Sequence, residues 1–132
     1  MKKHILLIDD DFDEVLILCA ALDDAGIDHT CYWASEVEAA VHLLQDISPD
    51  LILIDLNMPK TNGIMGIRRL RCLEHSAHVP IALYSTCILD ATVVCAAQAG
   101  ATCCIQKPDN LPDLRKMVCG FFSTTERSAR IC

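Results

Sequence analysis

The chain has 132 residues, which is enough for one domain with its own hydrophobic core. Hydrophobic residues make up 52% of it, which excludes a disordered chain, and the net charge of −7 argues against binding to nucleic-acid phosphates. No apolar run reaches the roughly 20 residues that cross a membrane, and the N-terminal apolar run is too short for a secretory signal. We therefore expect one globular cytoplasmic domain, with no direct nucleic-acid or membrane partner.

The apolar pattern predicts five strands that alternate with five helices. Short apolar runs predict strands at 5–8, 29–34, 51–55, 81–84 and 101–105. Apolar residues at helical spacing predict helices between 12 and 26, 35 and 48, 64 and 73, 89 and 100, and 110 and 121. This alternation favours a parallel α/β sheet of the doubly wound type, commonly ordered 2-1-3-4-5. Residues 1–122 should form the domain and residues 123–132 a flexible tail.

The sequence also predicts the N-caps of two helices and the exposed or buried faces of two others. Ser35 and Glu38 fit a capping box at the start of the second helix. Asn110 fits the N-cap of the last helix. Three arginines are expected on the exposed face of the third helix: Arg68, Arg69 and Arg71. The apolar stripe of the fourth helix is expected at Leu89, Val93, Ala96 and Ala97.

Cysteines and histidines show no metal-binding spacing. The nine cysteines contain no C-x-x-C pair and no Cys/His spacing of the zinc type. Most lie inside apolar segments, so we expect small buried thiols in a reducing compartment. The adjacent Cys103 and Cys104 are interpreted as strand packing, with a redox role left open. The histidines share no spacing and are expected to be surface or packing residues: His4, His29, His42, His75 and His78.

Polar side chains that can bind a ligand or take part in a reaction follow four of the five predicted strands. They are Asp9 and Asp10, Asp55, Ser85 and Thr86, and Lys107. Because the carboxyl ends of parallel strands meet at one edge of a sheet, we expect these side chains to lie close together. Each has a plainer alternative: acids ahead of a helix, a polar strand end, a helix N-cap at Ser85 and Thr86, or a solvated loop lysine. Chance can explain such residues at one strand end, but it is a much less probable explanation for their presence at four.

The carboxylates predict a magnesium site. Three carboxylates close together repel one another, and a hard divalent cation with oxygen ligands removes that repulsion. Asp10 and Asp55 suit direct ligands, Asp9 suits binding through water, and the backbone carbonyl of Asn57 suits a further oxygen ligand. A metal with open positions beside a carboxylate can bring in a phosphoryl donor for attack by that carboxylate.

Two further side chains suit the phosphoryl group itself. Lys107 would neutralise one phosphoryl oxygen as a point charge, and Ser85 would donate a hydrogen bond to another. The strand-end residues therefore point to phosphoryl transfer onto Asp55.

These motifs resemble the receiver domain of two-component response regulators. The matching segments are 5–10, 53–59 together with Gly63, 80–85 and 106–108, within a likeness that runs from about residue 3 to residue 122. The resemblance implies a flavodoxin-like fold and a phosphoacceptor role for Asp55. It implies magnesium on Asp9, Asp10, Asp55 and the Asn57 carbonyl. Ser85 falls on the family's switch hydroxyl, and Lys107 on its phosphate-contacting lysine.

The resemblance also implies partners. A histidine kinase or a histidine phosphotransfer protein would supply the phosphoryl group. Phosphorylation would then shift the population of two states and reshape the face made by helix four, strand five and helix five, where a downstream protein docks. We expect a stand-alone switch without an output domain, which catalyses only its own phosphorylation and dephosphorylation. Homodimer formation is left open.

Two positions depart from the family pattern. The family often has an aromatic residue three positions before the lysine, and Cys104 stands there in this chain. A small residue is frequent at the position of Thr86, whose hydroxyl and methyl groups are expected to narrow access to the phosphate. The site chemistry is therefore expected to be intact, whereas the switching response should differ.

Three other function classes compete with this interpretation. A pseudo-receiver would use the same fold only for protein binding or dimerisation, and it would be signalled by loss of Asp55, Asp10 or Lys107, all of which are present. A haloacid-dehalogenase-type phosphatase needs a second carboxylate two residues after its nucleophile, where this chain has Asn57. A nucleotide-binding enzyme is disfavoured because no glycine-rich phosphate-binding loop is present.

Overall fold

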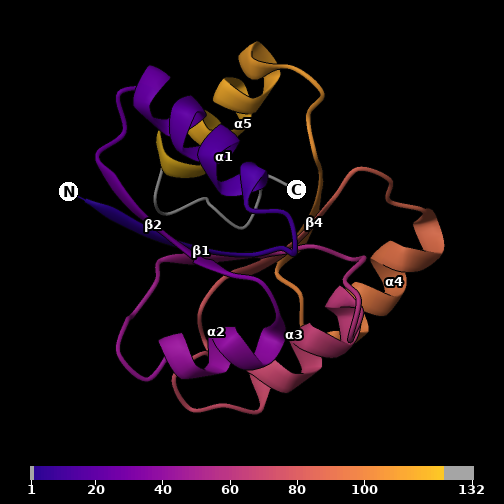
Figure 1. The fold of residues 1–132 in the computed structure, drawn as a ribbon. Coiled ribbons are helices and arrows are strands. Elements are labelled where there is room, and N and C mark those ends of the chain that lie inside the picture. Colours follow the sequence, from indigo (N-terminus) through magenta and orange to yellow (C-terminus); the bar gives the residue numbers. More distant parts are fainter. Residues whose placement is uncertain (1, 124–132) are drawn as a thin grey trace.

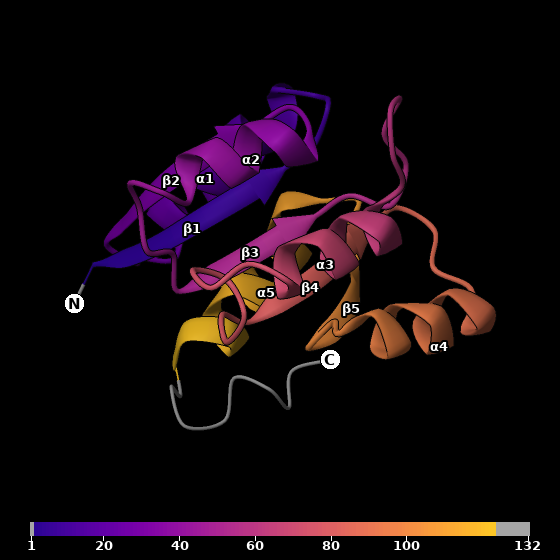
Figure 2. The same ribbon diagram turned by 90° about the horizontal axis from the view of Figure 1, so that it is seen from below.

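The structure, a computed structural model, describes residues 2–123 and contains one parallel five-stranded sheet. The strands are β1 (Lys3–Ile8), β2 (His29–Ala34), β3 (Leu51–Ile54), β4 (Ile81–Ser85) and β5 (Cys103–Gln106). Their order is β2-β1-β3-β4-β5, so the expected doubly wound, flavodoxin-like topology is confirmed. Figure 2 shows β1 and β3 running side by side in the same direction at the centre of the sheet.

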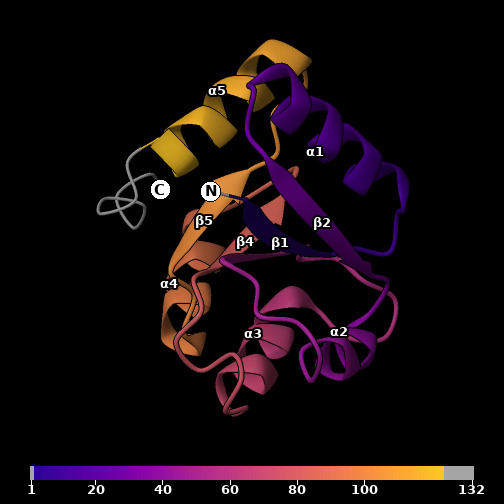
Figure 3. The ribbon, with the colours of Figure 1, turned by 90° about the vertical axis from the view of Figure 1, so that its left-hand side faces the viewer.

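Five helices cover the two faces of the sheet. They are α1 (Asp13–Asp24), α2 (Val37–Leu43), α3 (Gly63–Arg71), α4 (Asp90–Ala99) and α5 (Leu111–Ser123). Helices α1 and α5 lie on one face, and α2, α3 and α4 lie on the other (Figure 1). Figure 3 shows α1 and α5 next to each other above the sheet, in agreement with their contacts. The predicted tail lies outside the described residues from residue 124 onward, and Ser123 is the last residue of α5.

The hydrophobic core forms two layers because successive strand residues point to opposite faces. Leu7 and Leu53 belong to the layer under α1 and α5, whereas Ile8 and Ile54 belong to the layer under α2, α3 and α4. The central strands are therefore apolar on both faces, which explains their continuous apolar runs. Among residues 2–123, no helix has the length and apolar character needed to cross a membrane.

Helix capping agrees with one expectation and corrects another. Asn110 Oδ1 accepts a hydrogen bond from the backbone N–H of Asp113 at 2.9 Å, so this N-cap is confirmed. The capping box at Ser35 is wrong, because α2 begins at Val37 and no side chain within residues 2–123 caps it. Glu38 instead accepts a hydrogen bond from Arg69 at 3.1 Å. The Glu38 carboxylate, which would have completed the capping box, is therefore bound by the guanidinium of Arg69 on α3.

Arg71 is a second correction, since its side chain is half-buried and not on the exposed face of α3. Its guanidinium donates to the carbonyl oxygens of Val79 at 2.6 Å, Gly100 at 2.8 Å and Ser76 at 2.9 Å. Burial lowers the pKa of Arg71. Arg68 and Arg69 are exposed as expected. One arginine thus ties the end of α3 to the loops that surround β4 and β5.

The apolar stripe of α4 is only partly as predicted. The helix buries Ala96 and Ala99, whereas Leu89 and Val93 are exposed together with Val94. Small alanines let the helix axis approach the sheet, and the bulkier residues are left on the outer side. Among the described cysteines, Cys72, Cys87 and Cys95 are exposed and the others are only partly buried, so the expectation of mostly buried thiols is wrong. These three lie at the end of α3, ahead of α4 and on the outer side of α4.

Candidate functional site

The carboxylates of Asp9, Asp10 and Asp55 meet at the carboxyl ends of β1 and β3. Ile8 pairs with Ile54 in the parallel register, so the residues that follow them emerge abreast. The backbone N–H of Asp55 donates to the carbonyl of Ile8 at 2.9 Å. Carboxylate oxygens of the three aspartates all lie within 4.8 Å of one another. The arrangement suits a divalent cation with oxygen ligands.

Burial differs sharply among the three acids. Asp9 is 1% exposed and Asp55 is 8% exposed, whereas Asp10 is open to solvent. Burial raises the pKa of Asp55; the charge of Lys107 opposes this effect, and the charges of Asp9 and Asp10 add to it. Keeping Asp55 ionised therefore costs free energy in the metal-free protein. A bound cation would offset this cost, so the residues present fit a magnesium ion.

Lys107 enters the same cluster from the loop after β5. Its Nζ lies 2.9 Å from Asp9 Oδ2, 3.6 Å from Glu14 Oε1 and 3.8 Å from Asp55 Oδ1, and its side chain is 10% exposed. Burial alone would lower the pKa of Lys107, but the hydrogen bond with Asp9 and the charges of the three acids outweigh burial and raise it. The lysine is therefore held as a cation beside Asp55, and its alternative interpretation as a solvated loop residue is wrong.

Ser85 supplies a hydroxyl that is ready for a ligand. The residue is 1% exposed, and within the part of the chain that the structure describes its Oγ has no hydrogen-bond partner. Its backbone carbonyl accepts a hydrogen bond from the N–H of Lys107 at 2.7 Å, which places the two residues together. A buried hydroxyl without a partner costs about 1–3 kcal/mol, and an anionic oxygen at this site would remove that cost.

The loop after β3 is held against Asp55 by Gly63. The N–H of Gly63 donates to the carbonyl of Leu56 at 2.8 Å. A Cβ atom at Gly63 would collide with the backbone carbonyl oxygen of Asp55 and would lie 2.9 Å from Leu83 Cδ1. Only glycine permits this close approach. Asn57, whose backbone carbonyl is a predicted metal ligand, is exposed on this loop and follows Asp55 by two residues.

The two positions that depart from the family pattern have different surroundings. Thr86 is exposed and lines a hollow of about 500 Å³ together with Lys107, Pro108 and neighbouring residues. Cys104 is partly buried against the core layer under α4, and burial raises the pKa of its thiol. The N-cap alternative for Ser85 and Thr86 is wrong, because α4 begins at Asp90 after Leu89.

Sequence reasoning missed two neighbours of the site. Glu14 lies in the first turn of α1, and its Oε1 is 3.6 Å from Lys107 Nζ. Trp33 donates its indole N–H to the backbone carbonyl of Asp9 at 2.8 Å, and Phe12 packs edge-on against its ring. No local pattern signals these contacts, because only the folded chain brings α1 to the loop after β5 and β2 to the end of β1.

Comparisons with known proteins agree with this geometry. The response regulator receiver domain family model matches residues 5–119. The chain is 32% identical to regulatory protein AtoC of Escherichia coli, over 88% of this chain and 24% of AtoC. It is 29% identical to response regulator Rcp1 of Synechocystis, over 92% of this chain and 87% of Rcp1. The chain therefore spans about a quarter of AtoC but most of Rcp1.

Solved structures support the same assignment. The Mn²⁺-bound form of Rcp1 superimposes with a TM-score of 0.76 at 29% identity and covers 92% of each chain. The chemotaxis response regulator CheY4 of Vibrio cholerae gives a TM-score of 0.75 at 24% identity over 89% of this chain and 97% of CheY4, a likeness of fold. The family match, the strand order and the cluster at the strand ends agree, and the chain belongs to the response regulator receiver domain family.

Proposed function

We propose that this receiver domain is a phosphoacceptor switch in which Asp55 takes up a phosphoryl group with the help of magnesium. One observation carries the proposal: the carboxylates of Asp9, Asp10 and Asp55 gather beside a buried lysine at the end of the central strands. The buried, unpartnered hydroxyl of Ser85, taken among residues 2–123, supports it independently.

The environments of the carboxylates suggest which of them bind the metal directly and which binds it through water. Asp9 already accepts from Lys107 at 2.9 Å and from the backbone N–H of Asp11 at 2.9 Å, so it suits binding through water. Asp10 and Asp55 suit direct ligation, with the Asn57 carbonyl as a further oxygen ligand. When bound, the ion would spread the negative charge of the transferring group. The solved structure of Rcp1 is of an Mn²⁺-bound form, which supports the binding of a divalent ion by this chain.

The remaining side chains act on the phosphoryl group. An Asp55 carboxylate oxygen forms the bond to phosphorus as the bond from phosphorus to the donor's histidine nitrogen breaks. Lys107 neutralises one phosphoryl oxygen, and Ser85 donates its hydroxyl hydrogen to another. Satisfying Ser85 in this way draws the end of β4 toward the phosphate. The chain would catalyse only this transfer and the hydrolysis of its phosphoaspartate, in which water attacks phosphorus, the bond from phosphorus to the Asp55 oxygen breaks and inorganic phosphate leaves.

Receiver domains interact with histidine kinases or phosphotransfer proteins and with downstream targets. For this chain we propose that the downstream partner docks on the face made by α4, β5 and α5. Exposed apolar residues on that face support the proposal: Leu89, Val93, Val94 and Leu111. A cytoplasmic location stays a prediction, and homodimer formation stays open.

Intact mass spectrometry after incubation with acetyl phosphate tests the proposal. We expect a gain of one phosphoryl group in the wild type with Mg²⁺, and none without Mg²⁺ or in Asp55→Asn. Asp46→Asn, an exposed acid outside the site, should behave like the wild type. If the folded wild type binds no Mg²⁺ and acquires no phosphoryl group, the proposal fails and the pseudo-receiver alternative gains support.

A further inference from the structure

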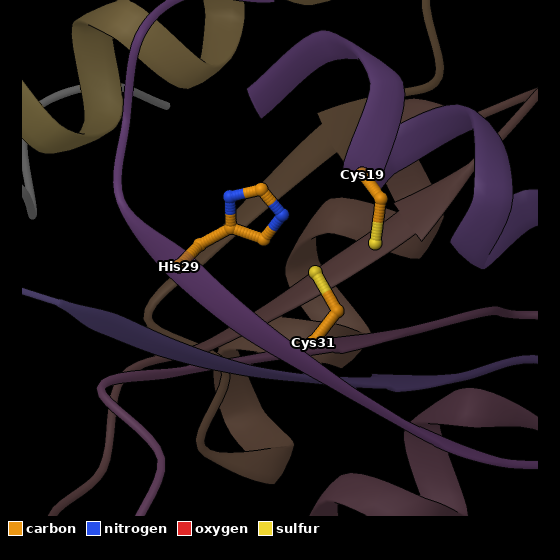
Figure 4. A group of neighbouring side chains, drawn as sticks. All are labelled: Cys19, His29 and Cys31. Atoms are coloured by element: carbon orange, nitrogen blue, oxygen red, sulfur yellow. The ribbon is translucent and has the colours of Figure 1, made fainter. Parts of the chain in front are cut away.

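A second cluster of metal-binding side chains lies away from the phosphoryl site, between α1 and β2. The Sγ atoms of Cys19 and Cys31 and a ring nitrogen of His29 all lie within 4.8 Å of one another. Figure 4 shows the two sulfur atoms pointing toward each other, with the imidazole of His29 beside them. The donors are two thiols and an imidazole, whereas the phosphoryl site offers only oxygen.

The backbone explains why these residues meet. His29 and Cys31 are two residues apart on β2, so their side chains lie on the same face of the strand. That face packs under α1, which carries Cys19. Asp23 follows Cys19 by one helical turn, and its Oδ1 lies 3.7 Å from His29 Nε2. Helix α1 thus contributes Cys19 and Asp23 to the cluster, and β2 contributes His29 and Cys31.

The hydrogen bonding of His29 prepares one nitrogen for a metal. Its Nδ1 lies 2.8 Å from the backbone carbonyl of Ile27. A carbonyl only accepts, so Nδ1 carries the hydrogen and Nε2 of the neutral ring carries a lone pair. Metal-binding histidines almost always donate their other ring N–H in this way. The side chain of His29 is 11% exposed, and that of Asp23 is open to solvent, which leaves an entry path for an ion.

We propose that Cys19, His29 and Cys31 bind one zinc ion, with Asp23 as the fourth ligand. Two thiolates, an imidazole and a carboxylate match the donors and the fourfold coordination that zinc prefers. In a tetrahedral zinc site the ligand atoms stand about 3.5–3.8 Å apart, so small side-chain rotations would close this cluster around the ion. The site is separate from the phosphoryl site and does not rest on the proposed function.

A zinc ion here would clamp α1 to the edge strand β2. Helix α1 also carries Glu14, which lies 3.6 Å from Lys107. An ion that binds only the folded chain stabilises it by mass action. At a hundredfold excess of free zinc over its Kd we expect Tm to rise by about 5–10 °C.

Cobalt titration of the reduced full-length chain tests the site. Excess Mg²⁺ in the buffer occupies the carboxylates of the phosphoryl site, and Co²⁺ serves as the spectroscopic probe. We expect one Co²⁺ per chain, with thiolate charge-transfer bands and the intense visible bands of tetrahedral cobalt. One equivalent of Zn²⁺ should then displace it. A reduced wild type that shows neither set of bands would overturn the proposal.

Variants locate the ion. Cys31→Ser and His29→Gln should weaken Co²⁺ binding by at least the 10–100-fold that loss of an outer hydrogen-bond partner causes. Cys72→Ser removes an exposed thiol outside the cluster and should leave the spectrum unchanged. If Cys31→Ser keeps the wild-type spectrum, other thiols hold the ion and the proposal is wrong. A Cys19–Cys31 disulfide in the purified chain, with no Co²⁺ binding after reduction, would contradict it equally.

Discussion

Lys107 and Asp9 form a 2.9 Å ion pair between residues 98 positions apart, and both side chains are almost completely buried. The pair joins the loop after the last strand to the end of the first strand. It occupies one carboxylate oxygen of Asp9 and holds a cation beside Asp55. The same ion pair therefore stabilises the fold and holds a positive charge at the candidate site.

Removal of Lys107 should destabilise the domain. Lys107→Met leaves Asp9, Asp55 and Glu14 without their shared cation, and breaking a buried pair from one side costs about 3–5 kcal/mol. We expect the free energy of unfolding in urea, without Mg²⁺, to fall by roughly that amount. Lys60→Met breaks an exposed pair with Glu36 and should change it by less than about 1 kcal/mol. Equal losses in the two variants would show that the buried pair contributes nothing special.

The contribution of Asp55 to the stability of the metal-free domain should be larger at low pH than at neutral pH. Its pKa is raised in the folded state, chiefly by burial, so the folded chain binds this proton more tightly than the unfolded chain. This contribution is fully present below the unfolded pKa and is lost as pH rises through the folded pKa. At pH 7 in EDTA, Asp55→Asn should therefore raise Tm by about 2–4 °C, or about 1 kcal/mol.

The difference in Tm between Asp55→Asn and the wild type should shrink as pH falls from 7 to 4, because the wild-type carboxyl becomes protonated. Added Mg²⁺ should stabilise the wild type more than the variant. A difference that stays constant from pH 7 to pH 4 would contradict the raised pKa of Asp55.

A methyl group at Gly63 should damage the site directly. Gly63→Ala would push its Cβ into the carbonyl of Asp55 and the side chain of Leu83. We expect a loss of about 1–3 kcal/mol in stability and slower phosphorylation by acetyl phosphate. Gly120→Ala is the matched control: among the described residues no atom lies within 4 Å of its Cβ position, and it should gain up to about 1 kcal/mol as a helical residue. If Gly63→Ala matched the wild type in both measurements, the close approach would be unimportant.

Trp33 should report metal binding by its fluorescence. It is the only tryptophan of the chain, and its indole N–H donates to the backbone carbonyl of Asp9 at 2.8 Å. An ion drawn to the carboxylates of Asp9 and Asp10 changes the field at this indole. We expect a saturable intensity change on Mg²⁺ titration that is at least tenfold weaker in apparent affinity in Asp10→Asn. Calorimetric Mg²⁺ binding with constant fluorescence would show that the indole does not sense the site.

The sheet and the edge that carries the candidate functional site follow from the amino-acid sequence alone. Apolar runs at residues 5–8 and 51–54 can be buried on both faces only as central parallel strands. Parallel strands bring their carboxyl ends to one edge, so Asp9, Asp55 and Lys107 had to meet there. Order along the chain and local hydrophobicity predict this shared edge, because parallel strands joined by crossover helices all end on the same side of the sheet. The strand order itself is established by the structure.

The face on which each side chain lies depends on contacts that form only in the folded chain. Local spacing cannot show that the Arg71 guanidinium turns inward to four backbone carbonyl oxygens, or that α4 packs through Ala96 and leaves Val93 exposed. Neighbouring elements set these orientations through packing and hydrogen bonding. The grouping of Cys19 with Cys31 arises in the same way. It exists only because α1 packs across β2, a contact between elements that no spacing along the chain encodes.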